Sequence, residues 1–147
     1  IRSGAYDRLL KGLDPQIEVH SKACPLFVPL VEEGWFKDDI TRSVVQRYLA
    51  ELKTQQVDTL VLGCTHYPLL KRLIGEEIGE EVILVNPSSS VVKEMKEYLL
   101  RHDMQSDAEQ GEYEFYVSDS TEKFRQFGQQ VLEIENLTVK RINIEKY

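Results

Sequence analysis

The stretch that decides the fold is VDTLVLGCTHYPLL, residues 57–70. Its first six residues are mostly apolar, as in a strand that is buried on both faces of a parallel sheet. Gly63 ends this strand, and residues 64–66, Cys-Thr-His, follow at once. A helix is predicted from about Tyr67, because the proline after it is tolerated in the first turn of a helix. The stretch therefore predicts a strand, a short turn of reactive side chains and a helix in immediate succession.

Helices and strands alternate along the rest of the chain. Apolar residues at helical spacing predict helices, and short apolar or alternating runs predict strands. The predicted helices lie at 4–13, 27–31, 40–52, 91–99 and 124–131, and the predicted strands at 17–21, 82–85, 113–117 and 137–142. This alternation is typical of an α/β protein with a largely parallel sheet flanked by helices. Ligands of such sheets bind beyond the carboxyl ends of the strands, where residues 64–66 are expected.

Polar residues mark where helices are expected to begin. Asp38 or Asp39, and later Ser118 or Asp119, are predicted to cap helices, because short polar side chains accept hydrogen bonds from the first free N–H groups. Residues 104–111 are expected to form a polar connection. Five aromatic side chains of the later part of the chain are expected to lie in the core. They are Tyr98, Tyr113, Phe115, Tyr116 and Phe124.

Size and composition restrict the class of protein. The chain has 147 residues, of which 41% are hydrophobic and 29% charged, and this is enough to bury one core. The net charge of −7 argues against a nucleic-acid-binding face. The longest apolar run, at 25–31, is far shorter than the roughly 20 residues that a membrane span needs. Two cysteines fit a reducing compartment, so we expect a cytoplasmic protein that binds neither nucleic acid nor a membrane.

The residues Cys64, Thr65 and His66 predict proton-transfer chemistry. The pKa of a cysteine thiol, ordinarily about 8.5, falls at a helix N-terminus or beside a cationic histidine. Free backbone N–H groups there, together with the Thr65 hydroxyl, suit a substrate carboxylate. His66 can accept or supply a proton near neutral pH. The pattern therefore favours proton transfer to or from an anionic small molecule, while an inert buried thiol at Cys64 stays open on these residues alone.

Other kinds of cysteine site fit the sequence less well. A thioredoxin-type redox site needs a second cysteine three residues after Cys64, and a phosphatase loop needs arginine where Leu70 stands. The possible zinc ligands of this chain lack the close sequence spacing of a usual ligand pair. These ligands would be Cys24, Cys64, His20 and His66. We therefore expect no metal site.

The sequence resembles a known enzyme family. The stretch VLGCTHYPLL, residues 61–70, closely resembles the second signature of the cofactor-independent aspartate/glutamate racemases, and its HYPLL end resembles the glutamate racemase branch. SGAYDRLL at 3–10 and ACPLFVPLVEEG at 23–34 are similar to segments that precede this signature in that branch. The resemblance extends along nearly the whole chain and is weakest at 104–111.

The resemblance implies an activity and a role for each site residue. Members of the family invert the α-carbon of an amino acid without a cofactor, with one cysteine on each face of the substrate. Cys64 matches the second of these cysteines, His66 the acid/base group that assists it, and Thr65 a substrate-binding residue. Glu32 matches a glutamate near the site, although a shift of the alignment by one residue would give this place to Glu33. The implied product is D-glutamate, which would serve bacterial peptidoglycan synthesis and cell shape.

Part of the family pattern does not occur in this sequence. The first catalytic cysteine, in a Cys-Asn-Thr context, and an Asp-Ser-Gly turn are missing, and Cys24 matches a structural segment instead. The resemblance therefore implies a carboxyl-terminal portion of a two-lobed racemase fold. Residues 1–85 would form most of the second lobe with the Cys-Thr-His turn, and residues 86–147 would return to the first lobe. The amino-terminal half would be a required partner, so this chain alone is expected to be inactive.

Two further functions stay open at this point. A related enzyme of the same superfamily would act on aspartate or a similar acid, although the histidine after Cys64-Thr65 argues against it. A fragment without catalysis would at most bind small carboxylates or a partner. The sequence also leaves open whether the chain forms a homo-oligomer.

Overall fold

Two short parallel strands organise the first part of the molecule. The computed structural model describes residues 1–108 and 111–146. Strand β1 (Thr59–Val61) pairs in parallel with β2 (Ile83–Val85). A 3-10 helix η1 (Tyr67–Leu70) and helix α4 (Lys71–Ile78) connect the two strands. This strand–helix–strand unit confirms the predicted α/β fold with parallel pairing.

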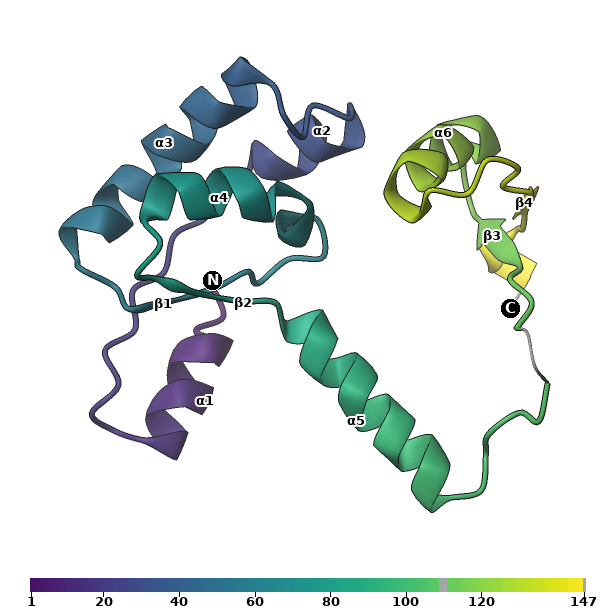
Figure 1. The fold of residues 1–147 in the computed structure, drawn as a ribbon, viewed down its shortest axis with the longest axis horizontal. Coiled ribbons are helices and arrows are strands. Elements are labelled where there is room, and N and C mark those ends of the chain that lie inside the picture. Colours follow the sequence, from purple (N-terminus) through teal and green to yellow (C-terminus); the bar gives the residue numbers. More distant parts are fainter. Residues whose placement is uncertain (109–110, 147) are drawn as a thin grey trace.

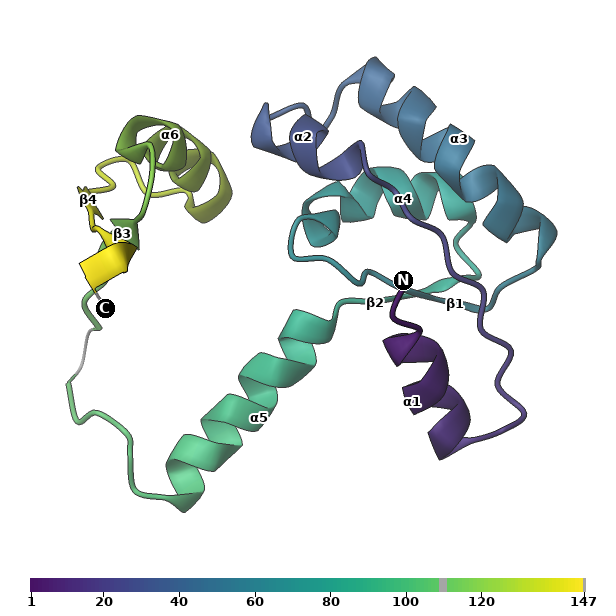
Figure 2. The ribbon, with the colours of Figure 1, turned by 180° about the vertical axis from the view of Figure 1, so that it is seen from behind.

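Three helices cover one face of this sheet (Figures 1 and 2). They are α2 (Phe27–Glu32), α3 (Asp39–Thr54) and α4. The Asp38 side chain caps α3 by accepting a hydrogen bond from the Ile40 N–H at 2.7 Å, as one of the two predicted caps. The buried residues of α3 recur every three or four positions, so one face of the helix enters the core. They are Thr41, Val45, Leu49 and Leu52.

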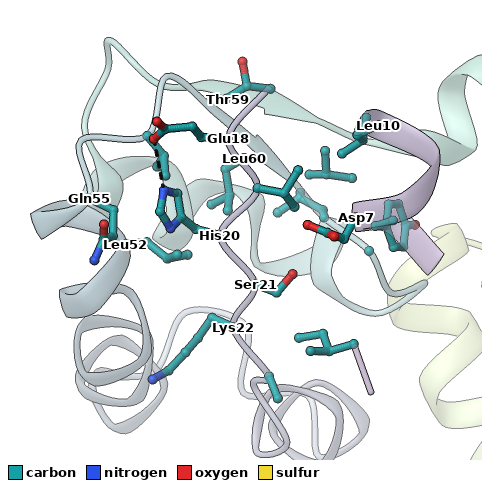
Figure 3. A pocket seen from close by; sticks show the side chains of 18 of the residues that line it. Asp7, Leu10, Glu18, His20, Ser21, Lys22, Leu52, Gln55, Thr59 and Leu60 are labelled. Atoms are coloured by element: carbon teal, nitrogen blue, oxygen red, sulfur yellow. Dashed lines mark ion pairs between the residues drawn. The ribbon is translucent and has the colours of Figure 1, made fainter. Parts of the chain in front are cut away.

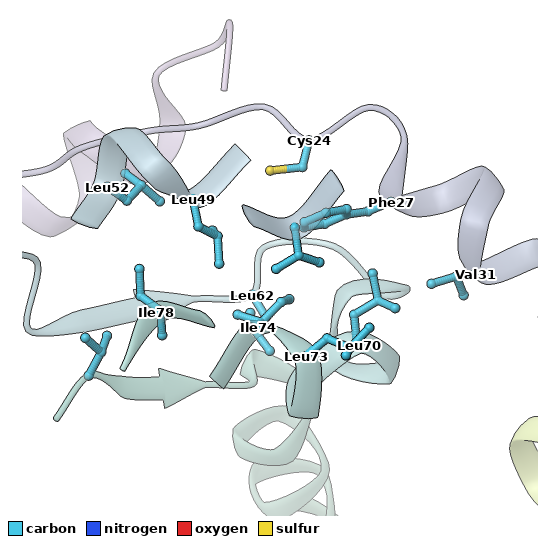
Figure 4. Packing of buried hydrophobic residues seen from close by; sticks show 12 residues of the cluster. Cys24, Phe27, Val31, Leu49, Leu52, Leu62, Leu70, Leu73, Ile74 and Ile78 are labelled. Carbon is cyan, nitrogen blue, oxygen red and sulfur yellow. The ribbon is translucent and has the colours of Figure 1, made fainter. Parts of the chain in front are cut away.

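The core lies between these helices and the sheet (Figure 4). Phe27 is its largest fully buried side chain, and its ring meets the rings of Tyr48 and Tyr67 edge-to-face at 5.4 and 5.1 Å. Aromatic pairs in this geometry add about 0.5–1.5 kcal/mol to the burial of their surface. The cluster of buried residues comprises Cys24, Phe27, Val31, Val45, Leu49, Leu52, Leu62, Leu70, Leu73, Ile74, Ile78 and Val82.

The opposite face of the sheet is open. Helix α1 (Ala5–Leu13) lies on this side (Figures 1 and 2) and has no buried residue. A cavity of about 1050 Å³ lies between α1, residues 17–21 and β1 (Figure 3). The prediction that β1 is buried on both faces is therefore wrong, since Thr59 is exposed. Of the described helices and strands, α1 alone lies on the cavity side of this strand, and it buries no residue there.

The strand predicted at 17–21 is also wrong. These residues run beside the cavity without strand pairing (Figure 3). Within the described chain, residues 18–22 make no backbone–backbone hydrogen bond. A strand needs a neighbouring strand for its ladder of hydrogen bonds, and the cavity occupies that position. The alternation of side chains predicts a strand here, but no strand of the described chain lies beside the segment.

The later part of the chain begins with a long helix. Helix α5 (Pro87–Arg101) is capped by the Asn86 side chain, which accepts a hydrogen bond from the Ser88 N–H at 3.2 Å. It extends away from the first part of the molecule (Figure 1). Of the predicted connection at 104–111, residues 109–110 lie outside the described residues. No helix of the described chain is long and apolar enough to span a bilayer.

A second strand–helix–strand unit ends the chain. Strands β3 (Phe115–Val117) and β4 (Val139–Arg141) pair in parallel, with helix α6 (Thr121–Leu132) between them in sequence. A 3-10 helix, η2 (Ile144–Lys146), follows β4. Ser120 caps α6 by accepting from the Lys123 N–H at 3.3 Å, so the prediction of Ser118 or Asp119 as the cap is wrong.

The predicted aromatic core of the later part is largely wrong. The side chains of Tyr98, Tyr113 and Tyr116 are exposed, and only Phe115 and Phe124 are half-buried. The rings of these two phenylalanines lie 6.3 Å apart. Helix α5 has no buried residue, because no described element packs on its apolar side. The apolar pattern was present, but its packing partner is not part of the described chain.

Candidate functional site

The Cys-Thr-His turn is tied to the carboxyl end of β1. The Leu62 N–H donates to the Val85 carbonyl at 2.9 Å and so extends the pairing of β1 and β2 beyond the strands themselves. The Cys64 N–H then folds back to the Leu62 carbonyl at 2.9 Å, and the Tyr67 N–H donates to the Cys64 carbonyl at 3.3 Å. These bonds close the turn and leave the Cys64 side chain half-buried at the sheet edge. The site therefore lies at the strand end where α/β proteins bind ligands.

His66 lies beside the thiol. Its Nδ1 is 4.0 Å from the Cys64 sulfur and 3.2 Å from the Thr65 hydroxyl oxygen. The same nitrogen serves both neighbours, and which of them it bonds depends on the tautomer of the ring. A thiol and an imidazole at this separation can pass a proton between them after a small movement.

Glu32 approaches the other nitrogen of the same ring. Its Oε1 lies 3.6 Å from His66 Nε2, and 60% of the Glu32 side chain remains exposed. An ion pair this exposed contributes only about 0–1 kcal/mol, so its effect is to orient the imidazole rather than to stabilise the fold. The contact belongs to Glu32, which ends α2, and this favours Glu32 over Glu33 as the glutamate near the site. The other three predicted site residues, Cys64, Thr65 and Glu32, thus gather around the imidazole of His66.

The second cysteine of the chain is chemically different. Cys24 is buried in the core, and burial raises the pKa of its thiol to about 11, an effect that the Lys22 charge partly offsets. The thiol is therefore protonated at neutral pH and packs as a small apolar group. The Cys24 carbonyl accepts a hydrogen bond from the Tyr67 hydroxyl at 3.1 Å. Burial, with the nearby Cys24 and Cys64, also raises the pKa of Tyr67, so this hydroxyl remains a donor.

One histidine considered as a zinc ligand from the sequence lies away from the turn. His20 faces the cavity beside Glu18 (Figure 3), with its Nε2 3.9 Å from the Glu18 carboxylate. Among residues 1–108 and 111–146, no three His, Cys, Asp or Glu side chains gather as a metal site would require.

Known proteins similar to this chain include glutamate racemases. No family model matches the chain. A glutamate racemase of Geobacter metallireducens is 46% identical over 133 residues, which cover 90% of this chain and 49% of that protein. A glutamate racemase of Thermoanaerobacter sp. (strain X514) is 41% identical over 149 residues, covering 100% of this chain and 56% of its own length. The chain is related to the glutamate racemases. It spans about half the length of these relatives.

Solved glutamate racemase structures share the fold. The Francisella tularensis enzyme, solved in complex with D-glutamate, superposes with a TM-score of 0.89 at 33% identity. The superposition covers 99% of this chain and 55% of that enzyme. The Thermus thermophilus glutamate racemase, solved with beta-chloro-D-alanine, gives a TM-score of 0.82 at 32% identity. This match covers 99% of the present chain and 54% of the Thermus chain.

One neighbour of the site was missed in the sequence. Phe127 of α6 lies with its ring centroid 6.2 Å from that of His66. In the sequence, Phe127 was read only as part of the apolar stripe of a helix. No local pattern could reveal the contact, because the two residues are far apart in the chain and belong to different strand–helix–strand units. Its contact with the Cys-Thr-His turn appears only in three dimensions.

Proposed function

We propose that this chain forms the carboxyl-terminal portion of a cofactor-independent glutamate racemase. The observation that carries the proposal is the half-buried Cys64 thiol, 4.0 Å from His66 at the carboxyl end of β1. The identity of up to 46% with proteins named glutamate racemase supports glutamate as the substrate.

In the proposed reaction, Cys64 acts on one face of the substrate α-carbon. As a thiolate it removes the α-proton of one enantiomer, and as a thiol it returns a proton to the planar carbanion formed from the other. His66 accepts the thiol proton in the first case and restores it in the second, through Nδ1. Neither a metal nor an organic electron sink takes part, so the charge of the carbanion must be stabilised by fixed hydrogen-bond donors in a site that excludes water.

Thr65 and Glu32 are the proposed substrate-binding residues. The Thr65 side chain is exposed at the turn, where its hydroxyl can donate to a substrate carboxylate. Glu32 is acidic and contacts His66, so it suits the ammonium group of the substrate and the orientation of the imidazole together. An amino acid offers one group of each charge, and the two side chains suit the two groups.

The reaction needs a second acid/base group on the opposite face of the substrate. Cys24 does not suit this role, because it is buried in the core with a raised pKa. We propose that the opposing thiol comes from polypeptide outside this chain, in an amino-terminal half. Residues 1–85 would then form most of one lobe, and residues 86–147 would complete the lobe that bears the opposing thiol. The chain alone would be inactive.

The proposed cellular role follows from the product. D-Glutamate would enter peptidoglycan synthesis in the cytoplasm, which would link the protein to the cell wall and to cell shape. The proposed partners are thus a small amino acid and the remaining half of the enzyme, with no nucleic acid or membrane involved.

A chimera tests the proposed activity. In it, this chain replaces the matching half of the Thermoanaerobacter relative, and circular dichroism follows the optical activity of added glutamate or aspartate. We expect glutamate to racemise in both directions without pyridoxal phosphate and in the presence of a chelator. The chain without the second half is the control and should be inactive. Faster turnover of aspartate, or no turnover by a folded chimera, would contradict the proposal.

A further inference from the structure

The imidazole of His66 is in contact with three separate elements. Its nitrogens meet Thr65 in the same turn and Glu32 at the end of α2. Its ring lies against Phe127 of α6, with an angle of 30° between the ring planes. Phe127 is half-buried, packs on the core cluster and lies 6.5 Å from the ring of Phe36. Of these contacts, only the one with Phe127 comes from the last strand–helix–strand unit of the chain.

A second close approach involves α6 near its contact with His66. Gly34 follows α2 with a left-handed φ of 77°, and a Cβ added there would lie 2.9 Å from the Gln130 Oε1. Gln130 stands three residues after Phe127, so both side chains lie on the same side of α6. The backbone at Gly34 therefore approaches the end of the Gln130 side chain, which stands about one helical turn from Phe127 on α6.

The contact with Phe127 restrains a movement that the polar contacts leave free. The polar contacts of the two ring nitrogens, with the Thr65 hydroxyl and the Glu32 carboxylate, act on the edge of the imidazole, so they do little to stop the ring from tilting. An aromatic neighbour at 6.2 Å restricts this tilt. Since the Cys64 sulfur is already 4.0 Å from Nδ1, a small tilt would remove the thiol from reach.

We propose that Phe127 is a positioning residue that holds the His66 imidazole against Cys64, so that docking of α6 controls proton exchange at this thiol. The consequence for catalysis rests on the proposed racemase function. The contact itself and its effect on the thiol do not depend on that function. Three variants separate the alternatives: Phe127→Leu removes the ring, Phe127→Tyr keeps it, and Phe124→Leu removes a ring of the same helix that pairs with Phe115 at 6.3 Å.

The first measurement uses the chain itself. NMR of the His66 ring protons should show a clear shift in Phe127→Leu, because the ring current of the phenylalanine is lost. Phe127→Tyr and Phe124→Leu should leave these signals close to their wild-type positions. Alkylation of Cys64 by iodoacetamide at neutral pH, followed by peptide mass spectrometry, should become slower in Phe127→Leu alone. Cys24 serves as the internal unreactive thiol.

The second measurement uses the chimera. Phe127→Leu should lower kcat about tenfold with KM nearly unchanged, and more in one direction of racemisation than in the other, because His66 assists only the thiol on its own face. Phe127→Tyr should restore kcat. Unchanged His66 signals and an unchanged rate of Cys64 alkylation in Phe127→Leu would overturn the proposal, as would equal effects from Phe124→Leu. An inactive parent chimera with the expected NMR and alkylation results would refute the racemase assignment and leave the positioning of His66 supported.

Discussion

Helices α3 and α5 are nearly equal in length and both carry an apolar stripe, yet their surroundings differ. Helix α3 buries four residues against its neighbours, and Val45 among them is fully buried. Helix α5 buries none, and Val92, Met95 and Tyr98 on it are 65%, 58% and 50% exposed. This difference shows that an amphipathic pattern indicates which face of a helix is apolar. It does not ensure that another element of the described chain packs on that face. The same contrast separates residues 24–82 from the rest of the described chain.

Burial follows this division closely. Every buried hydrophobic residue of the described chain except Leu137 lies between Cys24 and Val82. Ion pairs on the surface join α3 to α4, with Arg42 and Lys53 on α3 contacting Glu76 and Glu77 at 2.7 and 3.0 Å. Such exposed pairs contribute little, so the stability of the chain resides in the apolar cluster.

Paired alanine substitutions test the contrast with the largest expected effect. Leu73→Ala, at a residue 1% exposed, should lower the free energy of unfolding by about 3 kcal/mol through lost burial and a cavity. Met95→Ala on α5 should change it by no more than about 0.5 kcal/mol. Urea unfolding followed by circular dichroism measures both. Equal losses would mean that α5 packs as tightly as the cluster.

Alkaline pH should lower the free energy of unfolding through Cys24 of the buried cluster, by less than Leu73→Ala lowers it. The unfolded Cys24 thiol ionises at about pH 8.5, whereas burial raises its folded pKa to about 11. The folded chain therefore binds more protons than the unfolded chain in this window. Its stability should be complete below about pH 8.5 and should fall by about 2–3 kcal/mol as the pH rises to 11.

Cys24→Ser provides the control for this titration. A serine hydroxyl does not ionise in this range. The free energy of unfolding of the variant should therefore fall less as the pH rises, even if the variant is less stable at neutral pH. Tyr67, whose pKa burial also raises, remains in the variant and accounts for a residual decline above pH 10. An unchanged slope between pH 8.5 and 10 in Cys24→Ser would contradict the account of Cys24.

The exposed apolar stripe of α5 should cause the chain to self-associate. A substitution there should change this association more than it changes the free energy of unfolding. Contiguous exposed apolar side chains favour contact with another surface. The chain alone should therefore associate at micromolar concentrations, and Met95→Glu should weaken this association several-fold. Sedimentation velocity across a concentration series provides the measurement. A monodisperse monomer without any substitution would show that the exposed stripe of α5 is harmless in solution.

The sequence allowed part of the fold and the site to be predicted, and for identifiable reasons. The cap at Asp38 and the strand–turn–helix around Cys64 are local patterns, and each formed as expected. The strand at 17–21 and the burial of Tyr98 were wrong because both depend on a neighbour that local patterns do not describe. The cap of α6 moved to Ser120 because several short polar residues in succession offer equivalent caps.

The same reasoning applies to the site. Cys64, Thr65 and His66 are adjacent in sequence, so their proximity was predictable. Glu32 came from the resemblance, and the structure brings it 3.6 Å from His66. The contact of His66 with Phe127 depends on the docking of a helix that is distant in sequence, so no local sequence pattern predicts it.

The most direct test of the central claim is the rate of glutamate racemisation by the chimera that carries Cys64→Ser. A serine hydroxyl is far less acidic than a thiol, so it cannot act as the base on this face of the substrate. We expect racemisation to fall below about one-thousandth of the parent rate in both directions, while D-glutamate still binds in calorimetry because Thr65 and the backbone donors remain. Racemisation near the parent rate would contradict the assignment of Cys64 as an acid/base group.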